Sequence, residues 1–436
     1  MSSATTTVAP LSQLLTKYQQ VRKRTAELCA PLAAEDYVPQ PIVDVSPPRW
    51  HLAHTTWFFE TFLLKGFQED YAWFHEKYPY LFNSYYIQAG DRWQRAQRGH
   101  LTRPTVDEIF AYRHAIDERM VGFLQHVDAG QEKEVCTLLE IGINHEQQHQ
   151  ELLLYDIKYI LCHNPMEPVY NNLPENSLAP MEKLPGDYQD FVTVGAGDYL
   201  IGYRGDGFCF DNEQPVMRVY LEEFGLRKGL VTNREYLAFM EDGGYDNPVL
   251  WLDDGWKWRQ EMAIDHPMYW HNTPDGWHEM TLNGMQPLHL DAPVAHVSFY
   301  EAEAFATWSG HRLPTEFEWE VAALNCQPDR KKSNLQDSNL FHPILPIDNH
   351  QKYYQLYGDV WEWTYSSYLP YHGYQPPPGA IGEYNGKFMI NQMVLRGGSC
   401  ATPPDHIRKT YRNFFHPDKQ WLFAGIRLAE GPKKTL

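Results

Sequence analysis

Asn144-His145-Glu146-Gln147-Gln148-His149-Gln150-Glu151 lies within a segment of helical periodicity that runs from about Glu132 to Cys162. Residues four apart on a helix are about 40° apart around its axis, so His145 and His149 project from one face. Two such imidazoles can bind one metal ion, and a third from another helix would leave coordination positions open. About one His-x-x-x-His is expected by chance among 20 histidines in 436 residues. The spacing alone therefore does not establish a metal site, and the neighbouring residues have to support it.

The neighbouring carboxylates are poorly placed to join this pair. Glu146 lies about 100° and Glu151 about 240° around the helix from His145, so neither shares the histidine face. This disfavours a site of two histidines and one carboxylate and favours a third histidine.

Trp50-His51-Leu52-Ala53-His54, almost a hundred residues earlier, offers two candidates for that ligand. We choose His54, because it lies on the inward stripe of Phe58 and Phe62. His51 faces a different direction and suits a supporting position behind the ligands. For each histidine taken singly, a hydrogen-bonded core imidazole without metal is the alternative.

Further helices are predicted on either side of the histidine stretches. One covers residues 11–28, and a second begins at Ser46-Pro47-Pro48, with Ser46 as its N-cap, and runs through Phe62. A third follows the capping box at Thr105-Val106-Asp107-Glu108, with an apolar stripe to Val127. Four long helices in about 160 residues favour an all-α four-helix bundle, which we assign to residues 9–162.

The chain changes character after the bundle. Residues 163–190 are rich in proline and are predicted to form a connector. From residue 191 to about 430, short strand signals and long polar loops predict an α+β domain. It begins with a strand, a glycine turn and a second strand at 192–202, and two helices are expected, at 298–308 and 315–323.

Composition limits the class of protein. A formal net charge of −19 disfavours nucleic acid or an anionic membrane as a partner. No apolar run approaches the ~18 residues that span a bilayer, and residues 1–7 lack the features of a signal peptide. The six cysteines are scattered without Cys-x-x-Cys pairs, which favours a reducing compartment. We therefore expect a cytoplasmic enzyme.

With these motifs in view, the whole chain resembles the sulfoxide synthases of ergothioneine biosynthesis. The motifs that carry the resemblance, in order, are Ser46-Pro47-Pro48-Arg49-Trp50-His51-Leu52-Ala53-His54-Thr55-Thr56-Trp57-Phe58-Phe59-Glu60, His145-Glu146-Gln147-Gln148-His149-Gln150-Glu151, Arg312-Leu313-Pro314-Thr315-Glu316, Gly358-Asp359-Val360-Trp361-Glu362-Trp363, Arg396-Gly397-Gly398-Ser399 and Phe423-Ala424-Gly425-Ile426-Arg427. The resemblance implies a DinB-like four-helix bundle followed by a C-type-lectin-like α+β domain similar to the formylglycine-generating enzymes.

The resemblance also implies a metal and a reaction. Carried over by motif, His54, His145 and His149 would bind a non-haem Fe(II) ion. The family reaction joins a thiol to C2 of the imidazole of hercynine (Nα-trimethylhistidine) and oxidises the sulfur with O2. Three protein ligands leave Fe(II) three positions for the imidazole, the thiolate and O2, which converts a three-body encounter into a local rearrangement.

The chain departs from actinobacterial relatives at the residue expected to donate a proton. Those relatives carry Tyr-x-x-Tyr in the second domain, whereas the matching segment here is Ile381-Gly382-Glu383-Tyr384 and lacks the first tyrosine. The bundle instead carries Asn83-Ser84-Tyr85-Tyr86 in a long connection, and such loops often carry function. We predict that Tyr85 or Tyr86 is the proton donor, with Tyr384 as the first alternative.

A second departure concerns the thiol. The relatives have Arg-Asn-Trp-Asp, whose acidic residue helps to hold γ-glutamylcysteine, where this chain has Arg412-Asn413-Phe414-Phe415. The loss of that carboxylate favours free cysteine over the dipeptide.

The remaining substrate-binding candidates combine cationic, aromatic, amide and acidic side chains. Arginine can clamp a carboxylate, aromatic rings can face the trimethylammonium group, and Gln148 lies on the metal face. For the arginines the alternative is a solvated basic surface, and for the phenylalanines it is ordinary packing in the core. The candidates are Arg95, Arg98, Gln148, Asn413, Phe414, Phe415 and, as another carboxylate for an ammonium group, Asp44.

Three other functions share features with this sequence. An ovothiol-type synthase would attack a different imidazole carbon of histidine, but such relatives commonly carry an extra methyltransferase domain. A lectin-like binding protein with a structural zinc would need a fourth ligand, and none is visible nearby. Formylglycine chemistry needs a pair of cysteines near the C-terminus, where the sequence has only Cys400.

Overall fold

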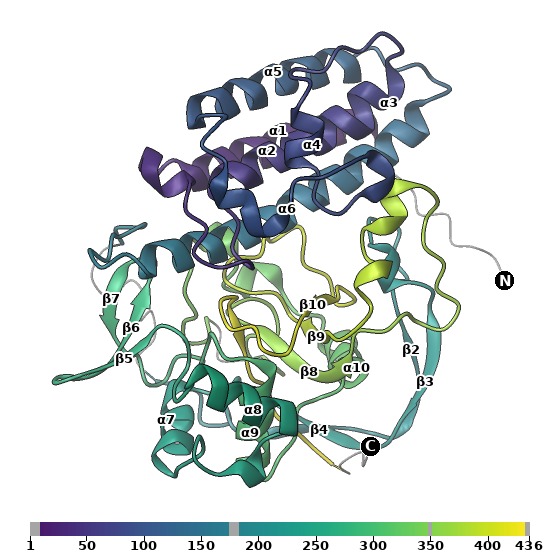
Figure 1. Cartoon of the computed structure of the whole chain (residues 1–436). Helices are drawn as coiled ribbons and strands as arrows, with labels where there is room; N and C mark the ends of the chain where they lie inside the picture. The colour runs from purple at the N-terminus through teal and green to yellow at the C-terminus, as the bar shows by residue number, and fades with distance from the viewer. Residues whose placement is uncertain (1–8, 174–182, 348–350, 432–436) are drawn as a thin grey trace. The chain divides into compact units, whose positions relative to one another are not determined.

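The computed structural model of the chain describes residues 9–173, 183–347 and 351–431. These residues belong to two compact units (Figure 1). Unit 1 comprises Met1–Tyr170, Arg204–Cys209 and Pro376–Gly386, and unit 2 comprises Asn171–Tyr203, Phe210–Gln375 and Lys387–Leu436. Unit 1 thus includes a short segment encoded far along the chain, Pro376–Gly386. Residues 1–7, which lack the features of a signal peptide, and part of the predicted connector, 174–182, lie outside the described residues.

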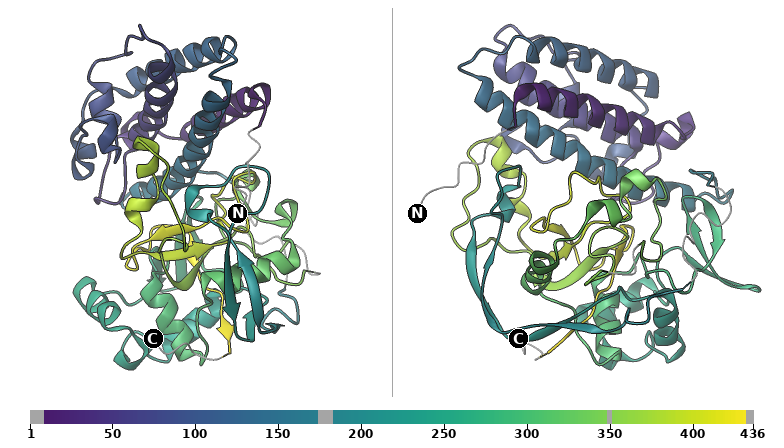
Figure 2. Two further views of the ribbon diagram at one scale, coloured as in Figure 1. Left: turned by 90° about the vertical axis from the view of Figure 1, so that its right-hand side faces the viewer. Right: turned by 180° about the vertical axis from the view of Figure 1, so that it is seen from behind.

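Four long helices form the body of unit 1 and run side by side in every view (Figures 1 and 2). They are α1 (Leu11–Cys29), α2 (Pro48–Phe59), α5 (Val106–Leu124) and α6 (Glu132–Cys162). All twelve residues of α2 are buried, as expected for the central helix of a bundle. The short helices α3 (Lys65–Phe67) and α4 (Tyr78–Phe82) lie in the connection between α2 and α5. The predicted helical bundle is confirmed, and among the described residues no helix is both long and apolar enough to cross a membrane.

The start of α2 differs from its prediction. Its N-cap position is Pro47, without a side-chain cap, so the prediction of Ser46 as N-cap is wrong. The Ser46 hydroxyl instead accepts a hydrogen bond from Arg98, and its backbone N–H donates to Asp156. At its other end α2 continues into a π-helical turn, Glu60–Leu64, a feature often found near functional sites.

The long helices of unit 1 meet at a buried carboxylate, Glu146 on α6. Arg22 on α1 donates to it at 3.0 Å and Arg113 on α5 at 2.5 Å, and the Thr25 hydroxyl donates at 2.6 Å. Arg22 also donates to Thr56 on α2. Because Glu146 is held by two arginines, it is not available as a metal ligand, in agreement with the direction predicted from the sequence.

Unit 2 is built from short sheets. A four-stranded sheet has the order β10-β9-β8-β11, with β8 and β11 parallel and the other neighbours antiparallel. Its strands are β8 (Trp361–Ser367), β9 (Met393–Arg396), β10 (Asn413–Phe415) and β11 (Ala424–Gly425). The remaining strands form the groups β1-β4-β12, β2-β3 and β5-β6-β7. Their bounds are β1 (Phe191–Val194), β2 (Gly197–Ile201), β3 (Met217–Leu221), β4 (Phe224–Arg227), β5 (Trp270–Thr273), β6 (Gly276–Thr281), β7 (Gly284–Pro287) and β12 (Ala429–Glu430). The two strands predicted at 192–202 exist as β1 and β2, but they pair with β4 and β3 and not with each other.

The helices of unit 2 outnumber the two that the sequence predicted. The predicted pair is present as α9 (Phe299–Trp308) and α10 (Glu316–Cys326), each with a capping box. The described part of unit 2 also contains α7 (Asn233–Glu241) and α8 (Asp253–Met262), so the prediction of two helices is wrong. Both extra helices have nearly the same length as α9, which the sequence did predict, so length does not explain why they were missed.

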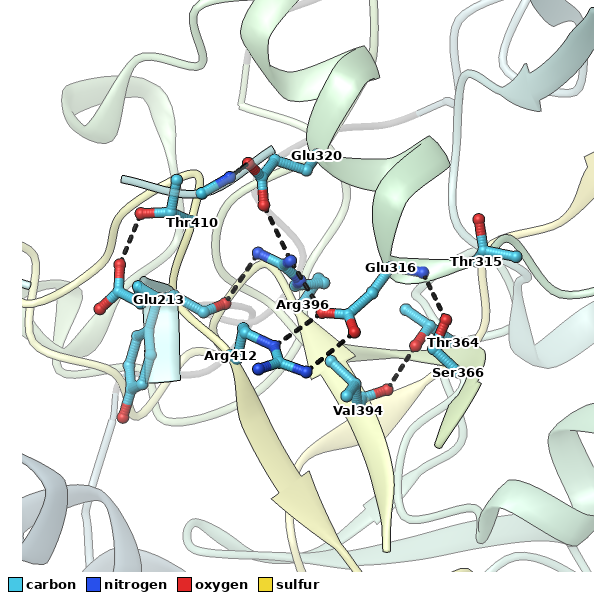
Figure 3. A network of polar contacts seen from close by, with 12 residues as sticks. Glu213, Thr315, Glu316, Glu320, Thr364, Ser366, Val394, Arg396, Thr410 and Arg412 are labelled. Atoms are coloured by element: carbon cyan, nitrogen blue, oxygen red, sulfur yellow. Dashed lines mark hydrogen bonds and ion pairs between the residues drawn. The ribbon is translucent and has the colours of Figure 1, made fainter. Parts of the chain in front are cut away.

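Buried ion pairs explain several of the sequence motifs in unit 2. Glu316 of the Arg-Leu-Pro-Thr-Glu motif accepts from Arg396 at 3.0 Å and from Arg412 at 2.8 Å (Figure 3). Glu362 of the Gly-Asp-Val-Trp-Glu-Trp motif accepts from Arg427 at 2.8 Å. These pairs join the helix α10 to the strand β9 and to the residue that precedes β10. They also join the strand β8 to Arg427, which lies between β11 and β12. The motifs therefore serve the scaffold of the unit.

Candidate metal centre

Three buried histidines from two helices of unit 1 converge. His54 comes from α2, and His145 and His149 come from α6, with side chains 0%, 1% and 9% exposed. One ring nitrogen from each lies within 4.8 Å of the other two. The Nε2 atoms of His54 and His145 are 3.2 Å apart. The geometry therefore places three imidazole donors around one point, as the helical spacing predicted for a metal site.

Hydrogen bonds orient two of the three rings. Nδ1 of His54 lies 2.6 Å from the carbonyl oxygen of Phe82, which can only accept, so Nδ1 carries the proton and Nε2 keeps a lone pair. Nδ1 of His149 lies 2.8 Å from Nδ1 of His51. Nδ1 of His145 has no hydrogen-bond partner among the described residues. Nε2 of His54 is thus free to bind a metal, and Nε2 of His145 lies beside it.

Burial keeps the cluster uncharged. It lowers the pKa of His145 to about 3 and holds the pKa values of His54 and His149 well below their usual range, while neighbouring imidazoles add to the effect for the latter two. Neutral imidazole is the form that binds a metal ion. Three neutral nitrogen donors with no carboxylate among them fit a divalent transition metal such as Fe(II) or Zn(II).

His54 lies in an aromatic stack that fixes the plane of its ring. The Trp50 indole stacks on it at a centroid distance of 4.5 Å and an interplanar angle of 10°, and Trp57 lies at 5.5 Å and 15°. The Arg98 guanidinium lies 3.3 Å from the centroid of the Trp50 ring. Arg98 is 4% exposed, and its donors reach the hydroxyls of Ser46 and Ser84 at 2.8 Å and 3.0 Å. Arg98, a predicted substrate-binding residue, therefore packs on the Trp50 ring, which in turn stacks on the candidate ligand His54.

Tyr384, from the segment Pro376–Gly386 of unit 1, lies against the histidine cluster. The Tyr384 ring lies 5.5 Å from that of His145, and its hydroxyl donates to Oε1 of Gln148. Tyr85 lies 6.1 Å from Tyr384 and 4.6 Å from Tyr86, centroid to centroid. Tyr86 is fully buried, and burial raises its pKa well above the usual value for a phenol. The structure thus brings Tyr85, Tyr86, Tyr384 and Gln148 together.

Glu383 connects the same segment to the loop that carries the two tyrosines. Its carboxylate oxygens accept hydrogen bonds from the backbone N–H groups of Ile87 and Gln88, each at 2.9 Å. These groups directly follow Tyr86 in the chain. Glu383 therefore holds the tyrosine loop and the segment Pro376–Gly386 to one another.

The other predicted site residues have varied surroundings. Arg95 is exposed and donates to the backbone carbonyls of Val43 and Asp44, and the Asp44 side chain is partly exposed. Asn413, Phe414 and Phe415 form β10 of unit 2.

The two phenylalanines of β10 pack against aromatic rings of unit 2. Phe414 stacks on Tyr368 at a centroid distance of 4.0 Å, and Phe415 meets Trp421 edge to face at 5.4 Å. A role of β10 in substrate binding stays a prediction.

Sequence reasoning missed two residues of this region, Asp156 and Glu383. Asp156 follows His149 by seven residues on α6, which is almost two whole turns, so helical spacing would have placed it on the same face. Its carboxylate lies 2.9 Å from Nε2 of His51. Glu383 had no such signal, because nothing local links it to a loop almost 300 residues earlier.

Comparisons with known proteins match both parts of the chain. A family model of the DinB superfamily matches residues 17–153, and one of the sulfatase-modifying factor enzyme 1-like domain matches residues 177–342 and 328–432. The chain is 34% identical to a hercynine oxygenase of Mycolicibacterium smegmatis over 66% of this chain and 70% of the relative. It is 31% identical to a hercynine oxygenase of Mycolicibacterium thermoresistibile over 88% and 87%. Ergothioneine biosynthesis protein 1 of Schizosaccharomyces pombe is 25% identical over 60% of this chain and 33% of that protein.

Proposed function

We propose, from the premise that this chain belongs to the family of the hercynine oxygenases, that it is an Fe(II)- and O2-dependent enzyme of ergothioneine biosynthesis. Members of that family are oxidoreductases, and so is this chain. In the proposed reaction, cysteine or γ-glutamylcysteine is joined to C2 of the imidazole of hercynine and its sulfur is oxidised to the sulfoxide. The observation that carries the proposal is the convergence of the three buried histidines.

The reaction balances with O2 as the only oxidant. Forming the C–S bond from an imidazole C–H and a thiol S–H removes two electrons, and oxidation of the sulfur removes two more. O2 accepts all four electrons. One of its oxygen atoms enters the sulfoxide, and the other leaves as water with the two protons released from the C–H and S–H groups.

His54, His145 and His149 would hold the iron. When bound, Fe(II) supplies open coordination positions at which the imidazole, the thiolate and O2 meet. The protein keeps these three ligands neutral by burial and limits rotation of the His54 ring by stacking it between Trp50 and Trp57.

Arg98 is proposed to bind the carboxylate of the thiol substrate. It is buried, burial holds the pKa of its guanidinium well below the usual range, and it makes no ion pair with the described residues. An anionic group would compensate this charge, and a carboxylate matches the forked donors of arginine. Arg95 is proposed as a second, more exposed contact. Gln148 is proposed to bind hercynine, since it lies one residue before the ligand His149.

A phenol from the tyrosine cluster is proposed to donate the proton that the reduction of oxygen requires. Tyr85 and Tyr86 are the first candidates and Tyr384 is the alternative. Burial raises the pKa of Tyr86, so its hydroxyl keeps its proton at neutral pH. A phenol that stays protonated can act as a general acid.

The preference for cysteine and a cytoplasmic location complete the proposal. The preference rests on Phe414-Phe415, which lacks the carboxylate of relatives that use the dipeptide. The location rests on the six cysteines, which form no disulfide within the described residues.

The test is anaerobic loading of the purified protein with one equivalent of Fe(II), followed by oxygen uptake and product mass analysis. We expect uptake to require hercynine and a thiol together and the product mass to equal that of the sulfoxide. The His145→Ala protein, treated in the same way, is the control and should consume almost no O2. Uptake with histidine in place of hercynine would favour an ovothiol-type activity. The proposal would be refuted if the protein bound Zn(II) tightly and the Fe(II)-loaded protein consumed no O2. That result would favour a structural metal site.

A further inference from the structure

We propose that His51 and Asp156 are positioning residues, which hold His149 in the tautomer and orientation that direct its Nε2 toward the metal. This inference rests on the proposed function, because it takes the cluster of His54, His145 and His149 as the metal site. It assigns a role to two buried polar residues that lie behind the cluster.

The three side chains form one continuous hydrogen-bonded chain. Nδ1 of His149 lies 2.8 Å from Nδ1 of His51, and Nε2 of His51 lies 2.9 Å from Oδ2 of Asp156. The backbone N–H of Ser46 donates to the same carboxylate oxygen at 2.8 Å. His51 and Asp156 are each 2% exposed. A chain so well enclosed has no water-exposed alternative for its polar atoms.

The direction of the hydrogen bonds follows from the carboxylate. Because a carboxylate oxygen accepts, and Oδ2 of Asp156 lies 2.9 Å from Nε2 of His51, the proton of His51 resides on Nε2. Nδ1 of His51 then has a lone pair and accepts from Nδ1 of His149. His149 therefore carries its proton on Nδ1, and its Nε2 keeps the lone pair that a metal ion requires. Each step leaves one proton on each imidazole, so the chain specifies one tautomer of the ligand.

The other two candidate ligands are held differently. His54 donates to a single backbone carbonyl, that of Phe82, and Nδ1 of His145 has no partner among the described residues. Metal-bound histidines usually donate their second nitrogen to a carboxylate, a carbonyl or a water, and loss of that partner typically weakens metal affinity by about 10- to 100-fold. His149 is the ligand whose second nitrogen is connected to a carboxylate. Its orientation should therefore be the one most sensitive to the residue behind it.

The decisive comparison uses His51→Phe and His51→Gln. Phenylalanine keeps a ring of similar size but can neither accept from His149 nor donate to Asp156. Glutamine offers an oxygen that accepts and an N–H that donates, so it can preserve the direction of the chain. We expect His51→Phe to lose about 10- to 100-fold in affinity for Co(II) and to change the visible absorption of the bound ion. His51→Gln should stay close to the parent in both measurements.

The measurement is anaerobic titration of the full-length, metal-free protein with Co(II) against a competing chelator, which needs no turnover. Thermal unfolding of each metal-free variant is measured beside it. Leu52→Ala, on the same buried helix, is the control and should lower stability while leaving Co(II) affinity unchanged. Asp156→Ala, which removes the far end of the chain, should weaken Co(II) binding in the same direction as His51→Phe.

The outcomes separate this inference from the proposed function. If the parent binds one Co(II), His145→Ala abolishes binding and His51→Phe binds like the parent, the positioning role is refuted while the metal site stands. Equal losses for His51→Gln and His51→Phe would also refute it, because the chain of donors would then be irrelevant. If the parent itself binds no Co(II), the metal site and the proposed function fail together.

Discussion

Glu146→Gln removes the charge on which Arg22 and Arg113 converge and should destabilise unit 1. The amide keeps nearly the same shape and can still accept from the Thr25 hydroxyl. Arg22 retains an ion pair with Asp117, but Arg113 loses the carboxylate that it contacts at 2.5 Å. An arginine that is almost fully buried would then have no counter-charge.

The pKa of the carboxyl group sets the size of the effect. Although burial alone raises the pKa of Glu146, Arg113 and Arg22 hold it at about 2, below its usual 4.5. This difference corresponds to about 3 kcal/mol of unfolding free energy at pH 7. Because the pKa is depressed in the folded state, the stabilisation is fully present above pH 4.5 and is lost as the pH falls toward 2. It should decrease to about 1.5 kcal/mol at pH 3.

Thermal and urea unfolding, followed by circular dichroism at pH 7 and pH 3, measure this difference. For a unit of this size, about 3 kcal/mol lowers the melting temperature by roughly 6–12 °C. The control is Glu118→Gln on α5, whose carboxylate pairs with His114 on the surface and should matter by at most about 0.5 kcal/mol. A Glu146→Gln protein that melts with the parent at pH 7 would refute the reasoning, as would a deficit that grows on acidification.

Three further predictions concern activity. Replacing any histidine of the cluster by alanine should remove most of the iron and nearly all sulfoxide synthesis without altering the circular dichroism spectrum; full iron and activity in His54→Ala would assign the third ligand elsewhere. With both thiols at equal concentration, cysteine should be used at least as well as γ-glutamylcysteine, and a strong preference for the dipeptide would point to another ammonium-binding carboxylate, such as Asp44. The double variant Tyr85→Phe, Tyr86→Phe should form sulfoxide about 10²-fold more slowly and divert O2 toward thiol oxidation. The parent rate and product ratio in that variant would move the proton donor to Tyr384.

Local geometry explains which parts of the site were predictable from the sequence. The spacing of His145 and His149 on a single helix fixes their common face, and the apolar stripe around His54 fixes the inward side of another. These are properties of a few turns of helix, and they do not depend on the rest of the fold. The direction of Glu146 was predictable for the same reason.

The parts that the sequence did not predict depend on contacts between distant segments or on weak local signals. Ser46 has the residue type and position of an N-cap, but its hydroxyl is engaged by Arg98, a tertiary contact that local pattern does not contain. The helix α7 carries only a short local signal, the capping box that begins at Thr232, and this signal was not recognised as a helix start. Tertiary contacts thus override local preference where a polar side chain has more than one possible partner.

The segment Pro376–Gly386 shows why the surroundings of the histidine cluster depend on both halves of the chain. All three candidate ligands come from the part that matches the DinB superfamily, and a bundle ending at Tyr170 would contain them. It would lack Tyr384, which lies against His145, and Glu383, which holds the loop that follows Tyr86. Both residues belong to the stretch that matches the sulfatase-modifying factor enzyme 1-like domain, and the chain enters unit 1 there from unit 2 and returns to it. The bundle therefore contains the three candidate ligands, while residues encoded within the second domain complete their surroundings.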